Sequence, residues 1–465
     1  MTAALVEALT GAIGPAGVLH GEAIDERYRT DILRKSRSDP GVVVRPQSTE
    51  EVAAVVRIAA AARVPITALG GATGLVGGGI AAAGGIVLSF ERMSRIVEID
   101  TVSMTITVES GAVIETVQKA TEAEGLLFPL DLGARGSATV GGTIATNAGG
   151  VRVLRWGMMR DMVLGLEAVL ADGTVVSSMT GMIKDNAGYN WKHLLIGSEG
   201  TLAVVTRAVL RLRPLPTTRQ TALIAMASFE AAIRAMRQLE TSLSGQLSSF
   251  ELMWEDFYAL HTEAQLAQRP RPMPLGHPIY ALVEAMGGDE EGDAALFQRA
   301  LMALSEQGLV ADAVIAQSDR HRVALWAMRD DLTPGYQPLR PFAAYDVSMA
   351  IADMPAFVEQ ARAAVMAIYP DVTMLFYGHA GDGNLHALLS IKRIDKDIQR
   401  AFDDAIYGVV RRFGGSIAAE HGVGTTRRDY LGWSRSESEV ALMRSLKHAL
   451  DPKGILNPGK IFLAI

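Results

Sequence analysis

The 465-residue chain contains no cysteine. It can therefore form no disulfide framework, no thiolate metal site and no cysteine nucleophile. Long hydrophobic runs are also absent: no apolar stretch reaches the roughly 18 residues that span a bilayer. The first twenty residues carry no Lys or Arg and so lack the basic start of a signal peptide. We expect a cytoplasmic protein, with any membrane contact limited to peripheral association.

An excess of basic residues is missing as well. Lys and Arg total 44 against 51 Asp and Glu, which gives a formal net charge of −7. A nucleic-acid-binding protein normally presents a basic face, so nucleic acid is not an expected partner. Hydrophobic residues make up 49% of the chain, enough for large buried cores. At roughly 150 residues per domain, the length predicts two or three domains.

Glycine, by contrast, is abundant and clustered. Eight of the 46 glycines fall between Gly70 and Gly85, and six fall between Gly133 and Gly150. The first cluster follows a predicted strand but has neither the G-x-G-x-x-G pattern that opens a helix nor the GK[ST] of a P-loop. Successive backbone N–H groups in such turns can bind an anion without a helix. Two ordinary glycine-rich turns are the alternative, and the presence of both clusters in one domain disfavours it.

The element pattern indicates an α+β protein. Ser48, with Glu51 three residues later, predicts the capped start of a helix, and residues 164–176 are predicted to form a strand. Strands and helices alternate irregularly up to the prolines Pro214 and Pro216, which favour a domain boundary. Strand, helix, strand, strand, helix, strand then follow over residues 221–317 and again over 343–420, an order typical of ferredoxin-like units. The predicted division is an N-terminal segment, a first domain, a second domain and a C-terminal segment, at 1–40, 41–214, 215–420 and 421–465.

Histidines concentrate in the second half of the chain. His379 and His386 flank the turn sequence AGDGN between two predicted strands, and a hairpin can bring two such side chains together. Glu420 would add a carboxylate, and two histidines with one carboxylate leave open positions on Zn, Fe or Mn. Glu420 and His421 can share a site only if the chain bends there, which Gly422 and the later Gly424 permit. Surface or core histidines are the alternative.

Four motifs carry a resemblance to a known superfamily. RPQSTEEV, GGATGLVGG, GSATVGGTIATNAGG and IGSEGTLAVVT resemble the FAD domain of the vanillyl-alcohol oxidase and cresol methylhydroxylase type. Members with covalent FAD often carry a histidine where this chain has Ala72, so the resemblance implies noncovalent FAD. It also implies a set of cofactor-binding residues: Gly70, Gly71, Ala72, Thr73, Gly74, Leu75, Gly78, Ser137, Gly141, Gly142, Thr146, Asn147, Gly149, Val205 and Asn457.

Motifs in the second half narrow the resemblance. GHAGDGNLH, SIAAEHGVGTTRRDYLGWS and LKHALDPKGILNPGK resemble the D-2-hydroxyglutarate dehydrogenase and D-lactate dehydrogenase branch, and the match runs from about Arg34 to Lys460. The resemblance implies that His421 is the catalytic base and that Arg329 grips the substrate carboxylate. Thr333 is expected one helical turn from Arg329, on the same face. The implied ligands of a divalent metal, with zinc ahead of manganese or iron, are His379, His386 and Glu420.

The expected activity follows from these parts. A D-2-hydroxy acid, such as D-2-hydroxyglutarate or D-lactate, is oxidised to a 2-oxo acid with the proton passing to His421 and hydride to the flavin. Two positions depart from the hydroxyglutarate pattern, because Ala344 replaces an expected Lys and Leu388 an expected Asn. We predict a less polar substrate pocket that also accepts smaller hydroxy acids.

Alternatives remain within reach of the same residues. A flavin oxidase of this fold would pass electrons to O₂, a metallohydrolase would use the His/Glu cluster on water, and a nucleotide-binding module would catalyse nothing. For a dehydrogenase, the electron acceptor is an electron-transferring flavoprotein, a quinone or a cytochrome. A homodimer is the default assembly.

Overall fold

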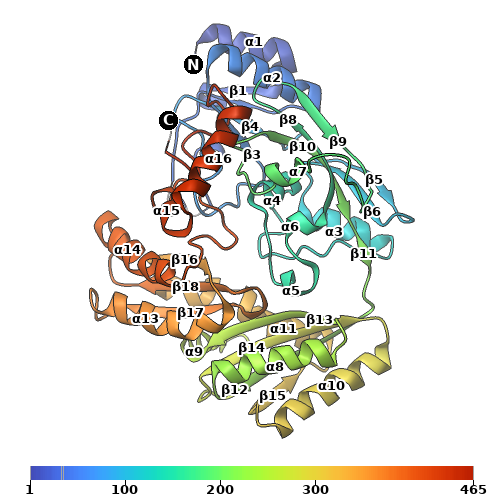
Figure 1. Cartoon of the computed structure of the whole chain (residues 1–465), viewed down its shortest axis with the longest axis vertical. Coiled ribbons are helices and arrows are strands. Elements are labelled where there is room, and N and C mark those ends of the chain that lie inside the picture. The colour runs from blue at the N-terminus through green and yellow to red at the C-terminus, as the bar shows by residue number, and fades with distance from the viewer. Residues whose placement is uncertain (1, 33, 35, 464–465) are drawn as a thin grey trace. The chain divides into compact units, whose positions relative to one another are not determined.

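The structure is a computed structural model that describes residues 2–32, 34 and 36–463 (Figure 1). The chain divides into two compact units, each described by itself below. Unit 1 comprises residues 1–150, 157–215 and 420–465, whereas unit 2 comprises residues 151–156 and 216–419. Unit 1 is therefore built from three separate stretches of chain.

Unit 1 contains a four-stranded sheet with the order β1-β2-β4-β3. The strands β2, β3 and β4 are parallel, because the helix α2 (Thr49–Ala62) crosses between β2 and β3. The side chain of Ser48 caps α2 by accepting the N–H of Glu51, as the sequence predicts. The helices α1 (Ala3–Ile13) and α2 pack their apolar faces on the sheet. The strands are β1 (Val18–His20), β2 (Val42–Val44), β3 (Ile66–Leu69) and β4 (Ile86–Ser89).

A five-stranded antiparallel sheet completes unit 1, with the order β5-β6-β10-β8-β9. Its strands are β5 (Ile96–Asp100), β6 (Thr105–Glu109), β8 (Val163–Val169), β9 (Val175–Ser178) and β10 (Val204–Arg211). A two-stranded ribbon pairs β7 (Leu126–Leu127) with β11 (Arg213–Pro214). The helices are α3 (Ile114–Ala123), α4 (Val140–Thr146), α6 (Met159–Met162), α7 (Lys192–Leu195), α15 (Leu431–Ser434) and α16 (Glu437–Leu450).

Unit 2 is organised around one seven-stranded antiparallel sheet with the order β15-β12-β14-β13-β17-β18-β16. The first four strands and the last three belong to the two predicted ferredoxin-like repeats, which join where β13 pairs with β17. The strands are β12 (Thr218–Met226), β13 (Leu247–Trp254), β14 (Ile279–Gly287), β15 (Asp312–Ile315), β16 (Phe342–Ser348), β17 (Thr373–His379) and β18 (Asn384–Ser390). The α+β fold expected from the sequence is confirmed.

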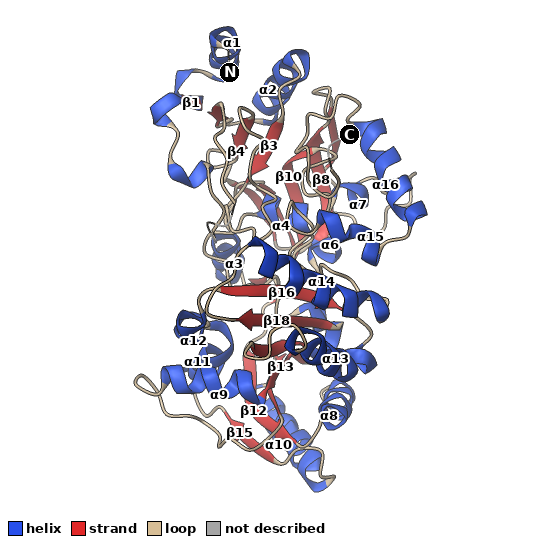
Figure 2. Cartoon of the chain, turned by 90° about the vertical axis from the view of Figure 1, so that its left-hand side faces the viewer, coloured by secondary structure: helices blue, strands red, loops and turns tan. Residues whose placement is uncertain are grey.

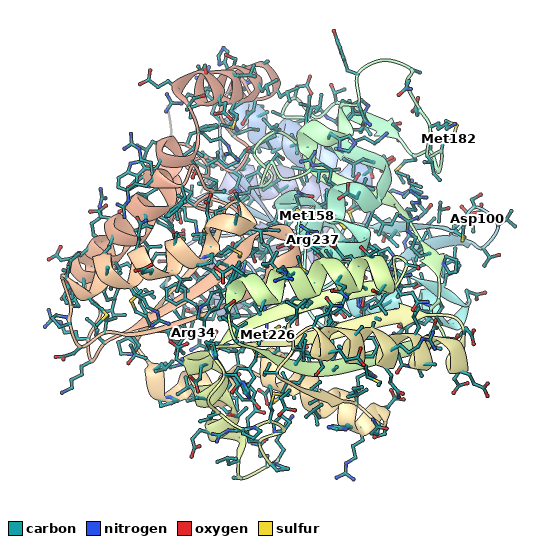
Figure 3. All side chains as sticks on the ribbon, turned by 60° about the horizontal axis from the view of Figure 1, so that its bottom comes forward. Arg34, Asp100, Met158, Met182, Met226 and Arg237 are labelled. Carbon is teal, nitrogen blue, oxygen red and sulfur yellow. The ribbon has the colours of Figure 1, made fainter. Side chains whose placement is uncertain are left out.

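Helices cover both faces of this sheet (Figure 2). On one face lie α8 (Phe229–Ser242), α10 (Glu290–Glu306), α13 (Met354–Met366) and α14 (Lys396–Arg412). Arg237, labelled in Figure 3, lies on the exposed side of α8 and pairs with Glu240. On the other face, α9 (Glu255–Gln265) and α11 (Asp319–Asp330) enclose an apolar cluster that includes Met253, Leu375 and Leu388. Unit 2 also contains α5 (Val153–Trp156) and α12 (Thr333–Tyr336).

Two strand predictions are wrong in detail. Residues 414–420 were expected to form the last strand of the second repeat, but Ser416 makes only an isolated bridge to Ser348. The glycines at 414 and 415 end the preceding helix and leave too short a segment for a strand. The stretch from Leu164 to Val176 is a hairpin of β8 and β9 rather than one strand, because its Asp-Gly pair turns the chain.

No helix among the described residues combines the length and the apolar character needed to cross a bilayer. One segment of unit 1 nevertheless exposes several apolar side chains. Residues 181–190 form an exposed loop that carries Met182, which Figure 3 shows on a segment projecting from the body.

Candidate active site

The two glycine clusters of unit 1 pack directly against each other. A Cβ on Gly71 would lie 1.9 Å from the carbonyl oxygen of Ser137, and one on Gly70 would lie 2.3 Å from Thr139 Oγ1. A Cβ on Gly141 would lie 2.7 Å from the Ser110 side chain. Only glycine permits such close approach of two backbones. The clusters, some 65 residues apart in the chain, therefore form one cradle, which we call the glycine cradle.

The first loop of the glycine cradle has hydrogen-bonding capacity to spare. The backbone amides of residues 71–78 donate no hydrogen bond to any described residue. Ala72 adopts a left-handed conformation with φ of 54°, and Asn147 at the end of α4 does the same with φ of 50°. Partly buried amides need an acceptor, and turns of this kind bind phosphate groups. The cradle therefore fits the pyrophosphate of a dinucleotide.

Asn457 ties the C-terminal segment of unit 1 into the same region. Its side-chain amide donates to the carbonyl oxygens of Gly78 at 3.0 Å and Glu199 at 2.7 Å. Its side-chain oxygen accepts the hydroxyl of Thr67 in β3 at 3.0 Å. Asn457 is thus placed beside the first glycine loop, although its own side-chain polar atoms are occupied within the protein.

Unit 2 brings His379 and His386 together across a hairpin. His379 ends β17 and His386 lies in β18, and their Nε2 atoms are 3.3 Å apart. Gly383 makes the connecting turn with φ of +77°. Two nitrogens bound at about 2.1 Å to one tetrahedral zinc lie about 3.4 Å apart. The spacing of the two rings therefore suits a shared metal ion.

A carboxylate on a neighbouring strand lies beside each histidine, and one of the two is within hydrogen-bond distance. Glu251 of β13 lies directly opposite His379 in the sheet, and its Oε1 is 2.7 Å from Nδ1 of that ring. Asp346 of β16 lies opposite His386, with its Oδ1 3.7 Å from Nδ1. A carboxylate on Nδ1 directs the lone pair of a neutral ring to Nε2. Glu251 does this for His379, whose Nε2 faces that of His386.

Arg329 completes a buried chain of charges. It lies in the last turn of α11, and its Nη2 is 3.0 Å from Oε2 of Glu251. Burial opposes ionisation of Glu251, but the His379 ring and the Arg329 guanidinium hold its pKa below the usual value. The Arg329 guanidinium also lies 4.7 Å from the ring centroid of Tyr377. Arg329 therefore neutralises the carboxylate that orients a candidate metal ligand.

The expected placement of Thr333 on the helix of Arg329 is wrong. The helix α11 ends at Asp330, and Asp331 leaves the helical conformation with φ of −85° and ψ of 73°. Thr333 is exposed and begins the separate helix α12, where Pro334 takes an early position. Proline is favoured in a first turn and interrupts a longer helix, and that preference explains the break.

Glu420 and His421 begin the last stretch of unit 1. Glu420 Oε1 accepts the backbone N–H of Gly150 at 3.0 Å. The chain bends directly after His421, because Gly422 and Gly424 have φ of +81° and +53°. The expected ligands are thus divided, with the two histidines in unit 2 and Glu420 in unit 1. The three-ligand set stays a prediction.

Sequence reasoning missed three carboxylates. Glu251 stands in the apolar strand sequence LSSFELMW and Asp346 in AAYDVSMA, and each is buried to within 1% exposure. Glu199, which follows Ser198 and precedes Gly200, is 8% exposed. Buried acids are rarely left without a partner, so a lone acid inside an apolar strand was the signal that could have revealed the first two.

Comparisons with known proteins identify the family of the chain. The chain matches the family model of an FAD binding domain over residues 40–178 and that of FAD linked oxidases, C-terminal domain, over residues 215–461. The chain therefore belongs to the FAD-linked oxidases, a class of flavin-dependent oxidoreductases.

Curated relatives place it more narrowly. It is 40% identical over 456 residues to D-2-hydroxyglutarate dehydrogenase of Xanthomonas citri pv. viticola, covering 96% of this chain and 95% of the relative. Identity to the enzyme of that name from Stutzerimonas stutzeri is 35%, with 99% of both chains covered. The chain is thus a member of the D-2-hydroxyglutarate dehydrogenase family. A putative mitochondrial D-lactate dehydrogenase of Schizosaccharomyces pombe is 32% identical, over 98% of this chain and 87% of the relative.

Solved structures of low sequence identity share the fold. p-Cresol methylhydroxylase superposes with a TM-score of 0.79 at 15% identity, covering 99% of this chain and 96% of the other. Alkyldihydroxyacetonephosphate synthase gives a TM-score of 0.77 at 17% identity, with 98% and 86% covered. The cresol methylhydroxylase-type fold expected from the sequence is confirmed.

Proposed function

We propose that this protein is an FAD-dependent dehydrogenase of D-2-hydroxy acids, assisted by a divalent metal. The observation that carries the proposal is the pair of Nε2 atoms 3.3 Å apart, each ring backed by a carboxylate, in a chain that also contains the glycine cradle. Binding of FAD alone would require only the glycine cradle. The buried histidine pair calls for a second, electrophilic component.

The residues of the glycine cradle fit noncovalent FAD. The amides of residues 71–78 have spare donors for the pyrophosphate, and the cradle has neither a histidine nor a cysteine for a covalent flavin link. We assign Gly70, Gly71, Gly141 and Gly142 to this function. When bound, FAD supplies the acceptor for the hydride of the substrate.

His379 and His386 fit two positions on zinc, with manganese or iron as the alternatives, and Glu420 is the proposed third ligand. Imidazole and carboxylate suit all three ions. When bound, such an ion supplies a Lewis acid that lowers the pKa of a substrate hydroxyl. The protein's part is to keep the Nε2 lone pairs aimed together; Glu251 does this for His379 through a hydrogen bond at Nδ1, and Asp346 provides a negative charge 3.7 Å from Nδ1 of His386.

His421 is the proposed base that accepts the hydroxyl proton of the substrate. An unperturbed imidazole has a pKa of about 6.5 and can accept a proton near neutral pH. We also assign Arg329 to the substrate carboxylate, since a guanidinium offers five donors and Glu251 occupies only one side of it. Thr333 is a weaker candidate because it is exposed.

We propose that the preferred substrate extends beyond D-2-hydroxyglutarate to smaller acids such as D-lactate. Ala344 and Leu388 lie directly opposite each other in the β16–β18 pair, two residues from Asp346 and His386 on the same face. Two apolar side chains there offer nothing to a second carboxylate. Strong selectivity for D-2-hydroxyglutarate over every monocarboxylate would contradict this part of the proposal.

An anaerobic flavin spectrum tests the proposed function. Purified holoenzyme is titrated with D-2-hydroxyglutarate, D-lactate and their L-enantiomers, before and after removal of metal with a chelator. We expect bleaching of the flavin by D-acids only, loss of bleaching after chelation, and recovery with Zn²⁺ or Mn²⁺. Bleaching that survives complete metal removal would exclude the metal from the reaction. Rapid reoxidation by O₂ would favour an oxidase.

Two histidine variants test whether the effect is specific to the His379–His386 pair. His386→Gln is expected to abolish metal-dependent bleaching while FAD stays bound, because His386 lies in unit 2 and the glycine cradle lies in unit 1. His448→Gln changes an exposed histidine on α16 and is expected to leave the titration unchanged.

A further inference from the structure

Glu199 of unit 1 occupies an unusual position that the proposed reaction does not use. Its backbone is left-handed, with φ of 52°, and its side chain is only 8% exposed. A non-glycine residue pays a conformational cost in that region, and such strain persists where the surroundings hold the residue firmly. Burial of the carboxylate adds a second cost. The fold therefore holds Glu199 in place despite the cost of its left-handed backbone and the cost of burying its carboxylate.

The carboxylate of Glu199 binds the turn that follows His421. Oε1 accepts the N–H of Val423 at 2.7 Å, and Oε2 accepts the N–H of Gly424 at 2.9 Å. Burial raises the pKa of Glu199, and these two N–H donors oppose that rise. Both side-chain oxygens thus bind one short turn, two and three residues beyond the proposed base.

The backbone of Glu199 is anchored to the glycine cradle. Its N–H donates to the carbonyl of Ala145 in α4 at 2.8 Å, and its carbonyl accepts the Asn457 side chain at 2.7 Å. On the other side of the turn, Thr425 donates its N–H to the carbonyl of Val76 at 2.9 Å. The turn at 422–425 is therefore held between Glu199 and the first glycine loop.

The turn packs closely against its neighbours on both sides. A Cβ on Gly422 would lie 2.8 Å from Glu199 Oε1, and a Cβ on Gly424 would lie 2.1 Å from the carbonyl of Val76. A side chain at either position would therefore clash, so the close packing of this turn depends on glycine. Loss of the Glu199 carboxylate removes the attraction that keeps the turn in place and leaves two backbone N–H groups without their partners.

We propose that Glu199 is a positioning residue for His421: its carboxylate fixes the turn at residues 422–424, and this turn sets the direction of the His421 ring. The inference rests on the proposed function of His421 and adds Glu199 to the residues on which proton transfer depends. Glu199 itself touches neither the proton nor the substrate. A displacement of about 1 Å in a reacting group can cost 100-fold in rate.

Stopped-flow flavin reduction by a D-2-hydroxy acid provides the kinetic test. Glu199→Gln keeps the shape of the side chain but presents an N–H₂ group to one of the two backbone donors. We expect the limiting rate of flavin reduction to fall 10- to 100-fold, while FAD content and the substrate Kd change less than twofold. Glu109→Gln is the matched control, because Glu109 is also a buried carboxylate of unit 1 and accepts the backbone N–H of Arg95.

A double variant distinguishes positioning from general weakening. If Glu199 acts through His421, adding Glu199→Gln to His421→Ala lowers the rate no further than His421→Ala alone. If the rate of the double variant falls by the product of the two single-variant losses, the inference is overturned. If His421→Ala alone has no effect, the proposed role of His421 fails first, and that result is separate from any effect of Glu199.

Hydrogen exchange tests the structural half of the inference without any turnover. In FAD-loaded protein, Glu199→Gln is expected to raise deuterium uptake in peptides covering residues 420–427, whereas Glu109→Gln is not. Unchanged uptake in that segment would refute the positioning role. If Glu199→Gln yields no folded protein, Gly422→Ala disturbs the same contact from the side of the turn and is read in the same way.

Discussion

His261 is a polar side chain buried in the core of unit 2. The residue lies in α9, is fully buried, and neither of its ring nitrogens has a hydrogen-bond partner among the described residues. Its ring lies 4.3 Å from that of Phe257, and a Cβ on Gly335 would lie 2.4 Å from it. Burial, with a smaller contribution from Arg329, lowers the pKa of His261 to about 4. The ring is therefore neutral in the folded protein at physiological pH.

This histidine predicts a specific pH dependence of stability. Below pH 6.5 the unfolded chain protonates His261, whereas the folded protein does so only near pH 4. The unfolded state thus binds more protons, and the free energy of unfolding falls as the pH drops from 6.5 to 4, by at most about 3 kcal/mol from this residue. His261→Phe is expected to flatten the slope in urea titrations over that range. A parallel slope in both proteins would contradict the assignment.

Glu251 supports a second prediction at this scale. Glu251→Gln keeps a hydrogen bond to His379 but removes the negative charge, and loss of such an orienting carboxylate typically costs 10- to 100-fold in metal affinity. We expect a loss of that size in calorimetric titration of apoprotein with Zn²⁺. Glu284→Gln, in the adjacent β14, is the control and should bind Zn²⁺ as the unmodified protein does. Equal affinity in both variants would remove Glu251 from the metal site.

At the scale of elements, short sequence patterns were enough to predict a hairpin and a helix cap. The hairpin of β17 and β18 was predicted from the turn residues of AGDGN, and the cap of α2 from Ser48 and Glu51. Glu251 could not be placed beside His379, because the two are 128 residues apart and only the pairing of β13 with β17 joins them. Strand register between distant segments depends on the whole packed sheet, which no local pattern reveals.

The glycine cradle contains positions that tolerate no side chain. Gly71→Ala places a methyl group against the carbonyl of Ser137, so the two loops must separate. We expect the purified variant to lose most of its bound FAD, as seen in the ratio of flavin to protein absorbance. Gly432→Ala, where a Cβ meets nothing within 4 Å, should keep its FAD. Full flavin content in Gly71→Ala would show that the two loops can part without loss of the cofactor.

At the scale of the whole molecule, the two units should respond to different ligands. FAD at 100 times its Kd stabilises the state that binds it by about 2.7 kcal/mol. We expect FAD added to apoprotein to slow hydrogen exchange in the peptides covering residues 70–78 and 137–150 of unit 1. Zn²⁺ should instead slow exchange around His379 and His386. Protection by FAD confined to unit 2 would contradict the assignment of the glycine cradle.

The division of unit 1 into three stretches also constrains the order of folding during synthesis. β3 receives a backbone hydrogen bond from Asn457, and the N–H of Ile66 donates to Ile455, so the outer edge of β3 lacks these partners until the last residues are made. At about 5–20 residues per second, the ribosome needs on the order of tens of seconds to complete the intervening chain. Unit 2 is contiguous from residue 216 to 419 apart from one short segment, and can fold within that interval. The glycine-rich half, although begun first, is therefore finished last, and a nascent chain that stalls before residue 455 would expose an incomplete FAD domain to chaperones and proteases.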